Sequence, residues 1–462
     1  MRTHQTIFAV LGAVLLVTGV AIGDSPIKPK SQLGLPAIIL PEPYPEWIQM
    51  YRISQRNPSA LLRYLDEEYL QQVVPGNSIE DERKRLGLRW YAVVRLGDIA
   101  GAELIPALER YARRYAKQEA GEGQAHKDEV ARFLRRHIER IRLRGQGRDV
   151  YVRAMIEWVR APIPPASGAN LREVDEGWSR VWAGARALGV LRAREGVDAL
   201  MGRARQHQSG FYDLERLCVR ALARIGDRRA LPILEWAVRN WMPDYWMAEK
   251  LPLEPDEPDI VWVYWQMRTE GMTMEEAVAD MIQAFENPGL KAGQVLLHIG
   301  KPAVPALLAV LKDPGSSLNK KRGALSVLVG LRAQEAKDVL LDLLRHDTSD
   351  MACTAAYSLG ALGARQALPD LIKAAEQDEN YLLKESAIRG LGKLGAPDAE
   401  PLLLRLATQH PDPRVRCEAV MALERVGTRA AIPILEQRLQ TEVDYLVGYI
   451  QNTIDALRKK KR

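Results

Sequence analysis

The apolar residues in the last third of the chain recur every three or four positions, which is the spacing of one face of an α-helix. In the stretch 414–439 the first such face consists of Val415, Ala419, Ala422, Leu423 and Val426. Gly427 predicts the end of this helix, because glycine accepts the left-handed backbone that closes a helix C-terminus. Pro433 opens a second helix, since its missing N–H needs no partner there. The pattern predicts a helical hairpin.

This hairpin pattern is repeated along the chain. The motif A-x-P-x-L, or a looser form of it, begins at Leu104, Ala230, Ala303, Ala367, Ala399 and Ala431. Asp198 and Asp338 stand in the proline position of two further copies. Positions 305, 338, 369, 401 and 433 are separated by 33, 31, 32 and 32 residues, a period typical of a solenoid of helical hairpins. The gap from 106 to 198 is longer and is expected to hold one or two degenerate units. The gap from 232 to 305 is expected to hold one.

One hairpin cannot bury its own apolar stripe, so neighbouring units must stack. We therefore predict an all-α fold, an α-solenoid of stacked antiparallel helical hairpins (an α–α superhelix) with an irregular N-terminal part. The residues expected to build the repeat are the turn glycines and slot prolines Gly226, Pro232, Gly300, Pro305, Gly363, Pro369, Gly395, Pro401, Gly427 and Pro433. Four aspartates are expected to mark the return turns and to cap the following helices, namely Asp313, Asp347, Asp378 and Asp412.

The stretch "DPRVRCEAVMALERVG", the Gly–A-x-P-x-L hairpin and a basic residue seventeen positions before the proline slot resemble HEAT repeats, particularly the bacterial repeats named after phycobilisome lyases. The basic position is filled by Lys321, Lys384 and Arg416, and Ala352 interrupts it. The resemblance is specific over 290–440, fair over 213–240 and thin over 60–205. It implies a right-handed α-solenoid whose second helices line a concave surface, and it implies interaction more often than catalysis.

The N-terminus has the pattern of an export signal. Arg2 precedes an apolar run from Ile7 to Val20, and the small residues Ala21 and Gly23 follow. This order predicts a secretory signal peptide, residues 1–23, cleaved after Gly23. The alternative is an uncleaved anchor, the one contact with a membrane that we expect, although the run is shorter than the ~20 residues that span a bilayer. The mature protein is expected in the periplasm, in the cell envelope or secreted.

The expected domains follow from these patterns. Residues 24–57 are proline-rich and predict an extended entry segment. Residues 58–290 are expected to form irregular, degenerate repeats with two inserts. Residues 291–445 form the regular repeats. Residues 446–462 are expected to be the end of the last helix and a frayed basic tail.

The first expected insert, 110–148, is basic. It holds twelve Lys or Arg against five Asp or Glu, whereas the whole chain has a net charge of +6. The candidates for contact with phosphate, an acidic protein or an anionic envelope polysaccharide are Arg135, Arg136, Arg142 and Arg144. The alternative is a solvated helix face with i,i+4 ion pairs, as Glu139 suggests. Nucleic acid is not expected, because aromatic residues interleaved with basic ones, as nucleic-acid binding uses them, are nearly absent from the segment.

The second expected insert, 240–267, concentrates aromatic residues among acids and prolines. The candidate binding residues are Trp241, Tyr245, Trp246, Trp262, Tyr264 and Trp265. Such rings suit sugar stacking or a proline-rich peptide. The alternative is that they pack onto neighbouring helices. The run "VWVYW" also fits a short edge strand.

The chain offers little sign of chemistry. The histidines show neither H-E-x-x-H nor another paired metal spacing, so no metal site, cofactor or catalytic residue is predicted. Cys218, Cys353 and Cys417 lie in helical patterns and are expected to be buried small apolar residues. The leading hypothesis is an exported, non-enzymatic scaffold that binds a protein or peptide through its concave face or aromatic insert. The alternatives are a carbohydrate-binding or structural module of the envelope and a bilin-lyase-like enzyme.

Overall fold

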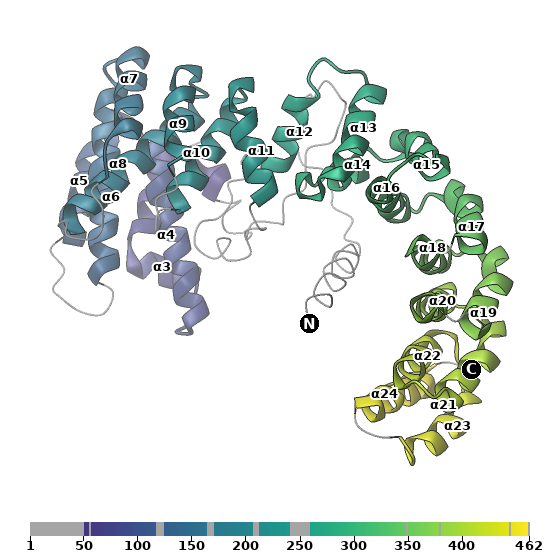
Figure 1. Cartoon of the computed structure of the whole chain (residues 1–462). Helices are drawn as coiled ribbons and strands as arrows, with labels where there is room; N and C mark the ends of the chain where they lie inside the picture. The colour runs from purple at the N-terminus through teal and green to yellow at the C-terminus, as the bar shows by residue number, and fades with distance from the viewer. Residues whose placement is uncertain are drawn as a thin grey trace. The chain divides into compact units, whose positions relative to one another are not determined.

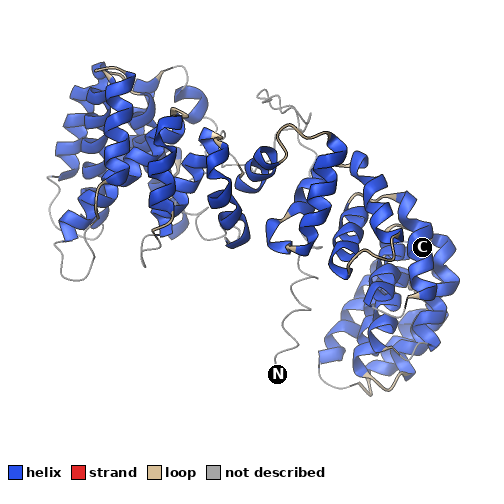
Figure 2. Cartoon of the chain, turned by 45° about the horizontal axis from the view of Figure 1, so that its top comes forward, coloured by secondary structure: helices blue, strands red, loops and turns tan. Residues whose placement is uncertain are grey.

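The computed structural model describes residues 50–54, 57–116, 124–163, 171–206, 212–240, 259–347, 350–377, 380–442 and 445–460. Within these residues the regular elements are α-helices and short 3₁₀ helices, and no strand is present (Figure 2). The predicted all-α class is therefore confirmed. The chain divides into two compact units, Met1–Ile39 and Leu40–Arg462. The first unit, and with it the predicted signal peptide 1–23, lies outside the described residues.

The helices of the second unit alternate between two rows (Figure 1). Row A consists of α4 (Ile79–Ile99), α6 (Gln124–Arg144), α8 (Leu171–Val190), α10 (Tyr212–Ile225), α12 (Ile260–Arg268), α14 (Ala292–Ile299), α16 (Leu318–Gly330), α18 (Asp350–Ala361), α20 (Tyr381–Leu394), α22 (Pro413–Val426) and α24 (Tyr445–Lys459). Row B consists of α5 (Ile105–Ala116), α7 (Arg148–Arg160), α9 (Val197–Ala204), α11 (Leu231–Asn240), α13 (Met274–Gln283), α15 (Val304–Lys312), α17 (Lys337–His346), α19 (Leu368–Gln377), α21 (Glu400–Gln409) and α23 (Ala431–Leu439). Each row A helix contacts the next row A helix along the chain. At the start of the array, η1 (Pro58–Leu65) and α3 (Glu67–Val73) pack on α4.

Both expected inserts contribute helices to the array itself. Helix α6 lies in row A between α4 and α8, and α12 lies between α10 and α14. The expectation that these parts of 110–148 and 240–267 stand outside the repeat is wrong. The expectation of an edge strand at "VWVYW" is also wrong, because Ile260–Arg268 is helical. The pairs α6–α7 and α12–α13 are the degenerate units that the two long gaps predicted.

The proline slot lies where row A passes to row B. A 3₁₀ turn precedes the row B helix at seven of these junctions, formed by η2 (Ala102–Leu104), η3 (Arg194–Gly196), η4 (Arg228–Ala230), η7 (Lys301–Ala303), η8 (Gln334–Ala336), η9 (Arg365–Ala367) and η10 (Pro397–Ala399). The slot residue is then the second residue of the row B helix, as Pro401 is in α21. Proline is tolerated there because the first helical N–H groups have no partner within the helix. The two remaining 3₁₀ turns, η5 (Ala284–Glu286) and η6 (Pro288–Leu290), lie between α13 and α14.

Four of the five predicted turn glycines have a positive φ, namely Gly226, Gly300, Gly363 and Gly395. After α8 and α16 the residue with a positive φ is Arg192 or Arg332 instead. Gly395 ends α20 in the left-handed conformation, with φ 67° and ψ 24°. Gly427 does not, because its φ of −61° and ψ of 147° are extended. The Nζ of Lys460 instead donates to the carbonyl oxygens of Arg425 and Gly427, at 2.9 and 2.8 Å. The start of the basic tail is therefore docked on α22 rather than frayed.

The expected aspartate caps are confirmed only at Asp412, whose carboxylate accepts from the backbone N–H of Arg414 at 2.8 Å and opens α22. Asp313 ends α15 instead, and Ser317 caps α16. Asp347 likewise follows the last residue of α17. Asp378 lies outside the described residues.

Small residues let the row A helices approach until their backbones touch. A Cβ on Gly360 of α18 would lie 2.1 Å from the carbonyl oxygen of Gly390 in α20. A Cβ on Gly392 would lie 3.0 Å from the Cα of Ala422 in α22. Larger side chains at these positions would therefore force adjacent row A helices apart.

Candidate functional site

The exposed apolar side chains of the described residues are concentrated on row A. Seven of the ten large apolar residues with high exposure lie on its helices: Ile79, Val190, Leu318, Leu382, Met421, Val447 and Tyr449. Row B contributes only Ile434 among the ten. Apolar surface that the fold does not bury marks an interaction surface when it is gathered on one face. The second helices of the hairpins, which the family resemblance implied as the binding side, do not carry it.

The outward positions of row A repeat with the period of the chain, and the N-terminal units fill them differently. In α22 the residues 16, 12 and 8 places before the proline slot are Cys417, Met421 and Arg425, none of which is fully buried. In α8 the same places are Trp182, Arg186 and Val190, and in α4 they are Trp90, Val94 and Asp98. These two N-terminal helices therefore place aromatic and charged side chains where α22 has a small, an apolar and a basic one.

These side chains form what we call the Asp98 cluster: Asp98, His137, Arg140 and Arg186. Asp98 of α4 accepts from Arg140 Nη2 of α6 at 2.9 Å and from Arg186 Nη2 of α8 at 2.7 Å. The Asp98 side chain is fully buried, and that of Arg140 is 1% exposed. Burial alone would raise the pKa of Asp98, but the guanidinium groups of Arg186 and Arg140 outweigh it and hold that pKa well below its usual range. The cluster thus joins three consecutive row A helices through one carboxylate.

His137 lies beside this ion triad and is completely buried. Its Nδ1 is 3.2 Å from Arg140 Nη1, which can only donate, and its Nε2 has no hydrogen-bond partner among the described residues. Burial, followed by the positive charge of Arg140, lowers the pKa of His137 well below 6.5. Gly97 makes room for the ring, because a Cβ there would lie 2.1 Å from Nδ1. The imidazole is therefore held neutral inside the array.

Aromatic rings close the other side of the cluster. Phe133 of α6 makes edge contacts with Trp90 and Trp182, each with ring centroids 5.1 Å apart. The guanidinium of Arg186 lies 5.9 Å from the ring centroid of Trp182. Edge-on ring contacts and a cation over a ring are both favourable, so the wall stabilises the arginine that bridges to α4.

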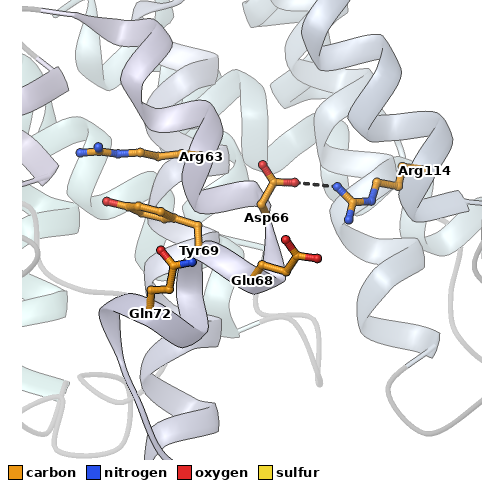
Figure 3. A pocket seen from close by; sticks show the side chains of 6 residues that line it. All are labelled: Arg63, Asp66, Glu68, Tyr69, Gln72 and Arg114. Atoms are coloured by element: carbon orange, nitrogen blue, oxygen red, sulfur yellow. Dashed lines mark hydrogen bonds and ion pairs between the residues drawn. The ribbon is translucent and has the colours of Figure 1, made fainter.

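A shallow pocket of about 420 Å³ opens at the start of the array, where it is lined by Arg63, Asp66, Glu68, Tyr69, Gln72 and Arg114 (Figure 3). The Asp66 carboxylate accepts from Arg114 Nη1 at 2.6 Å and from the Tyr111 hydroxyl at 2.7 Å. The Arg63 guanidinium lies 4.9 Å from the ring centroid of Tyr69. Asp66, Arg63 and Arg114 therefore already have partners in the chain, and these contacts hold α3 against α5.

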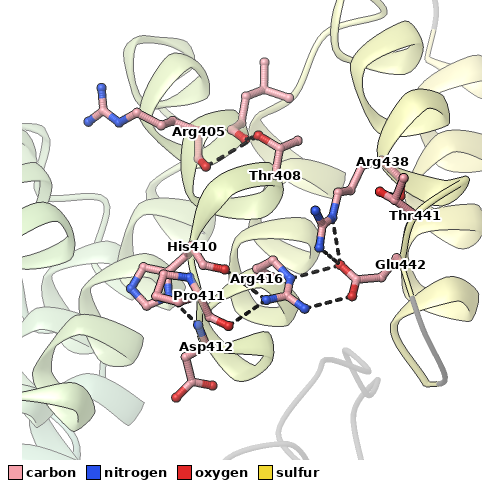
Figure 4. A network of polar contacts seen from close by, with 10 residues as sticks. Arg405, Thr408, His410, Pro411, Asp412, Arg416, Arg438, Thr441 and Glu442 are labelled. Carbon is pink, nitrogen blue, oxygen red and sulfur yellow. Dashed lines mark hydrogen bonds and ion pairs between the residues drawn. The ribbon is translucent and has the colours of Figure 1, made fainter.

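Arg416 is the centre of a polar network in the last units (Figure 4). It donates to both carboxylate oxygens of Glu442, at 2.9 and 2.8 Å, and to the carbonyl oxygens of His410 and Pro411, each at 2.9 Å. Arg438 Nε shares the same carboxylate at 2.9 Å. The network ties the turn before α22 to the turn after α23, which is a role in the repeat rather than in ligand binding.

Three of the four arginines predicted to grip an anion are engaged within the fold. Arg136 is buried, contacts Glu139 and Glu176, and lies 5.2 Å from the ring centroid of Trp158. Arg142 pairs with Glu109 at 2.7 Å. Arg144 donates to the Asp98 carbonyl at 2.5 Å and to the Ala100 carbonyl, where a cation complements the C-terminus of α4. Arg135 is exposed and forms no ion pair with a described residue.

Tyr264 and Trp265, two of the predicted aromatic binding residues, lie in the core, each 1% exposed. Trp265 Nε1 donates to the Leu290 carbonyl at 2.9 Å, and Arg268 Nη1 donates to the Tyr264 hydroxyl at 2.8 Å. Trp262 is half-buried, and its ring lies against His298. This part of the segment packs as the alternative interpretation predicted. The remaining three, at positions 241, 245 and 246, lie outside the described residues.

The sequence does not predict the Asp98 cluster, because a lone charged residue in a helix is ordinarily exposed to solvent. The repeat spacing could have indicated the cluster. Asp98 lies eight residues before slot 106 and Arg186 lies twelve residues before slot 198, which are two of the three row A places compared above. Among the cysteines, Cys218 is buried as expected, but Cys353 and Cys417 are half-buried on row A. No group of three or more His, Cys, Asp or Glu in the described part of the chain is placed to hold a metal ion.

Crossing a bilayer requires a long and predominantly apolar helix. No individual helix of the described segments meets that requirement. One bent pair, Ala292–Ile299 with Lys301–Lys312, meets it jointly, with an angle of 111° between its halves.

Comparison with known proteins places this architecture. Residues 304–386 and 368–450 match the HEAT repeats family, and residues 216–240 match the PBS lyase HEAT-like repeat. The uncharacterized protein SkfG of Bacillus subtilis (strain 168) is 32% identical over 113 residues, which are 24% of this chain and 65% of that protein. The chain thus spans less than two thirds of that relative.

Similar solved structures include the complex of CpcE and CpcF of phycocyanin lyase from Nostoc sp. PCC7120, with 20% identity, coverage of 65% of this chain and 94% of that one, and a TM-score of 0.23. Human deoxyhypusine hydroxylase in complex with glycerol is another, with 18% identity, coverage of 72% and 98%, and a TM-score of 0.26. The family matches fall on the hairpins described above. Residues 216–240 and 304–450 of the chain therefore form HEAT repeats.

Proposed function

We propose that this chain is an exported HEAT-repeat scaffold, without enzymatic activity, that binds a protein or peptide along the outward face of row A. The observation that carries the proposal is the gathering of exposed apolar side chains on row A and their near absence from row B among the described residues. Side chains such as Met421 on α22 and Tyr449 on α24 do not stabilise the solenoid core, because they remain exposed in it. A partner that covers them would gain the hydrophobic free energy that the fold leaves unused.

The stacking of row A supports this role. Backbone contact between α18 and α20 at Gly360 and Gly390 fixes the spacing of outward positions from one unit to the next. The Asp98 cluster does the same for α4, α6 and α8. A binding surface on rigid helices loses less conformational entropy on binding than one on loops. Export, the other part of the proposal, is supported by the signal-peptide pattern of residues 1–23.

A carbohydrate-binding module is less well supported. That alternative depended on the aromatic rings of 240–267, and Tyr264 and Trp265 are committed to the core. Row A offers exposed aliphatic and thioether side chains, as at Leu382 and Met421, which suit protein side chains better than sugar rings.

Site-specific photocrosslinking in the producing cell tests the proposal. A benzophenone amino acid replaces Leu382 or Met421 on row A, and Ile434 on row B serves as a control of matched exposure; the three side chains are 46%, 36% and 42% exposed. We expect discrete protein adducts from both row A positions and none from the row B position. Adducts of equal yield from both rows, or from row B alone, would contradict a row A binding face.

A further inference from the structure

We propose that the row A face of α16–α24 docks an acidic segment of a partner protein, one whose Asp and Glu residues alternate with apolar side chains. This inference rests on the proposed function and adds the chemistry of the partner. Neither the pocket beside Arg63, where Asp66 and Arg114 pair with each other, nor the buried Asp98 cluster offers such a surface.

Charge is divided unequally between the two rows of the regular repeats. The five row A helices from α16 to α24 hold eleven Lys or Arg and five Asp or Glu. The five row B helices from α15 to α23 hold six of each. Row A therefore has an excess of six positive charges, whereas row B is balanced. Stability of the solenoid does not require this difference, because both rows bury the same kind of apolar stripe.

Acidic residues of the turns between units neutralise basic side chains only at the N-terminal ends of the row A helices. Asp412 pairs with Arg414 at 3.0 Å, and Glu442 pairs with Arg416 at 2.8 Å. Further along the helices, Arg389 contacts Glu418. These pairs neutralise the arginines near the turns, whereas other basic residues of row A are not neutralised in this way.

Five basic residues of the row A helices α16 to α24 form no ion pair with any described residue: Lys321, Lys384, Lys393, Arg425 and Lys459. Lys393 of α20 and Arg425 of α22 occupy the same outward position in successive units, and both are exposed. Lys393 Nζ lies 6.0 Å from the ring centroid of Tyr357 on α18, so cation and aromatic surface adjoin.

Apolar and basic groups therefore lie next to each other on this face. Met421 lies one helical turn before Arg425, and Val447 and Tyr449 follow on α24. A partner chain that places carboxylates on Lys393 and Arg425 and apolar side chains on Met421 and Tyr357 would satisfy both kinds of group. Adjacent packed helices lie about 9 Å apart, so α18 to α24 span about 27 Å, which about 8 extended residues cover. A short linear segment is sufficient.

The test is fluorescence anisotropy with the full chain and a fluorescein-labelled peptide of about 12 residues in which Glu and Asp alternate with Leu. Two control peptides carry Lys or Gln in place of the acids. The double variant Lys393→Glu, Arg425→Glu reverses two charges on row A. The matched control, Lys312→Glu with Lys373→Glu, reverses two exposed charges on row B. We expect the row A variant to bind the acidic peptide about tenfold more weakly at low salt, and the row B variant to bind as the wild type does.

The outcomes separate this inference from the proposed function. Equal weakening by both variants would show attraction to net charge alone and overturn the inference. Binding of the Gln or Lys peptide at row A with no preference for the acidic one would overturn it as well, while the scaffold function would stand. Vesicles containing anionic phospholipid, and an anionic polysaccharide, are titrated in parallel. Row A-dependent binding of either in preference to the peptide would contradict a protein partner.

Discussion

The buried His137 makes stability depend on pH in a way that one substitution isolates. In the folded chain its ring faces Arg136, Arg140 and Arg186, and Asp98 is the one carboxylate beside it that favours a charged imidazole. Burial and these cations keep the folded-state pKa well below 6.5. Below about pH 6.5 the imidazole of His137 therefore binds a proton in the unfolded chain but not in the folded chain. The free energy of unfolding falls as the pH drops below about 6.5.

The magnitude follows from this linkage. Each pH unit below about 6.5 costs up to about 1.4 kcal/mol, so His137 alone removes about 2 kcal/mol of stability by about pH 5. Asp98 does not contribute in this window. Its folded pKa is lowered, so the stability that it supplies is lost only as the pH falls below the ordinary carboxyl range near 3.8.

The perturbation is His137→Gln, which stays neutral and keeps an acceptor for Arg140. Urea unfolding is followed by tryptophan emission between about pH 8 and about pH 5. All ten tryptophans lie at or before position 265, so the emission reports the part of the array that contains the cluster. We expect the difference in stability between wild type and variant to shrink by about 2 kcal/mol on acidification. His346→Gln, at an exposed position of α17, is the control. An unchanged difference across this range would refute the buried, neutral imidazole.

Three further substitutions test the repeat itself, each by thermal unfolding followed by far-ultraviolet circular dichroism. Gly360→Ala should destabilise by about 1–3 kcal/mol, although alanine is the better helix former, because its Cβ would meet the carbonyl of Gly390; an unchanged melting temperature would argue against the backbone contact. Arg332→Gly should stabilise by about 0.5–1 kcal/mol, because Arg332 has a φ of +53° at a position where other junctions have glycine; a loss would show that the arginine is not strained. Arg416→Met should cost about 1–3 kcal/mol, because the buried carboxylate of Glu442 would keep only Arg438 as a partner and the carbonyl oxygens of His410 and Pro411 would lose a donor; a neutral result would show that the network does not stabilise the fold.

Much of the fold could be predicted because residues close together in the sequence determine the helices and turns of each repeat. The apolar period and the turn residues at Gly395 and Pro401 predicted helices, boundaries and stacking. Gly427 has the same sequence signature but an extended backbone, because the tail Lys460 supplies donors to the last carbonyls of α22. The sequence of the hairpin alone does not predict this contact, because Lys460 lies outside the hairpin.

The site was predicted less well, since charge and aromatic content do not say which way a side chain faces. Arg136 and Trp265 belong to the two segments with the most conspicuous composition, and both are buried in the array. The sequence does not predict that Met421 is exposed, because an apolar residue on a helix is ordinarily in the core. Its exposure follows from the packing of α22 between α20 and α24, which only the assembled rows determine.

The protein carries its own reporters for the central claim. Cys353 and Cys417 occupy the same outward place on α18 and α22 and are half-buried, whereas Cys218 is fully buried, which raises the pKa of its thiol to about 12. The measurement is the rate of maleimide modification at Cys353 and Cys417, followed by mass spectrometry with and without the bound acidic peptide, beside a row B control, Ile434→Cys. We expect slowing of about tenfold at both row A cysteines and no change at position 434. Unchanged rates at Cys353 and Cys417 under saturating peptide, or protection at position 434 alone, would contradict it.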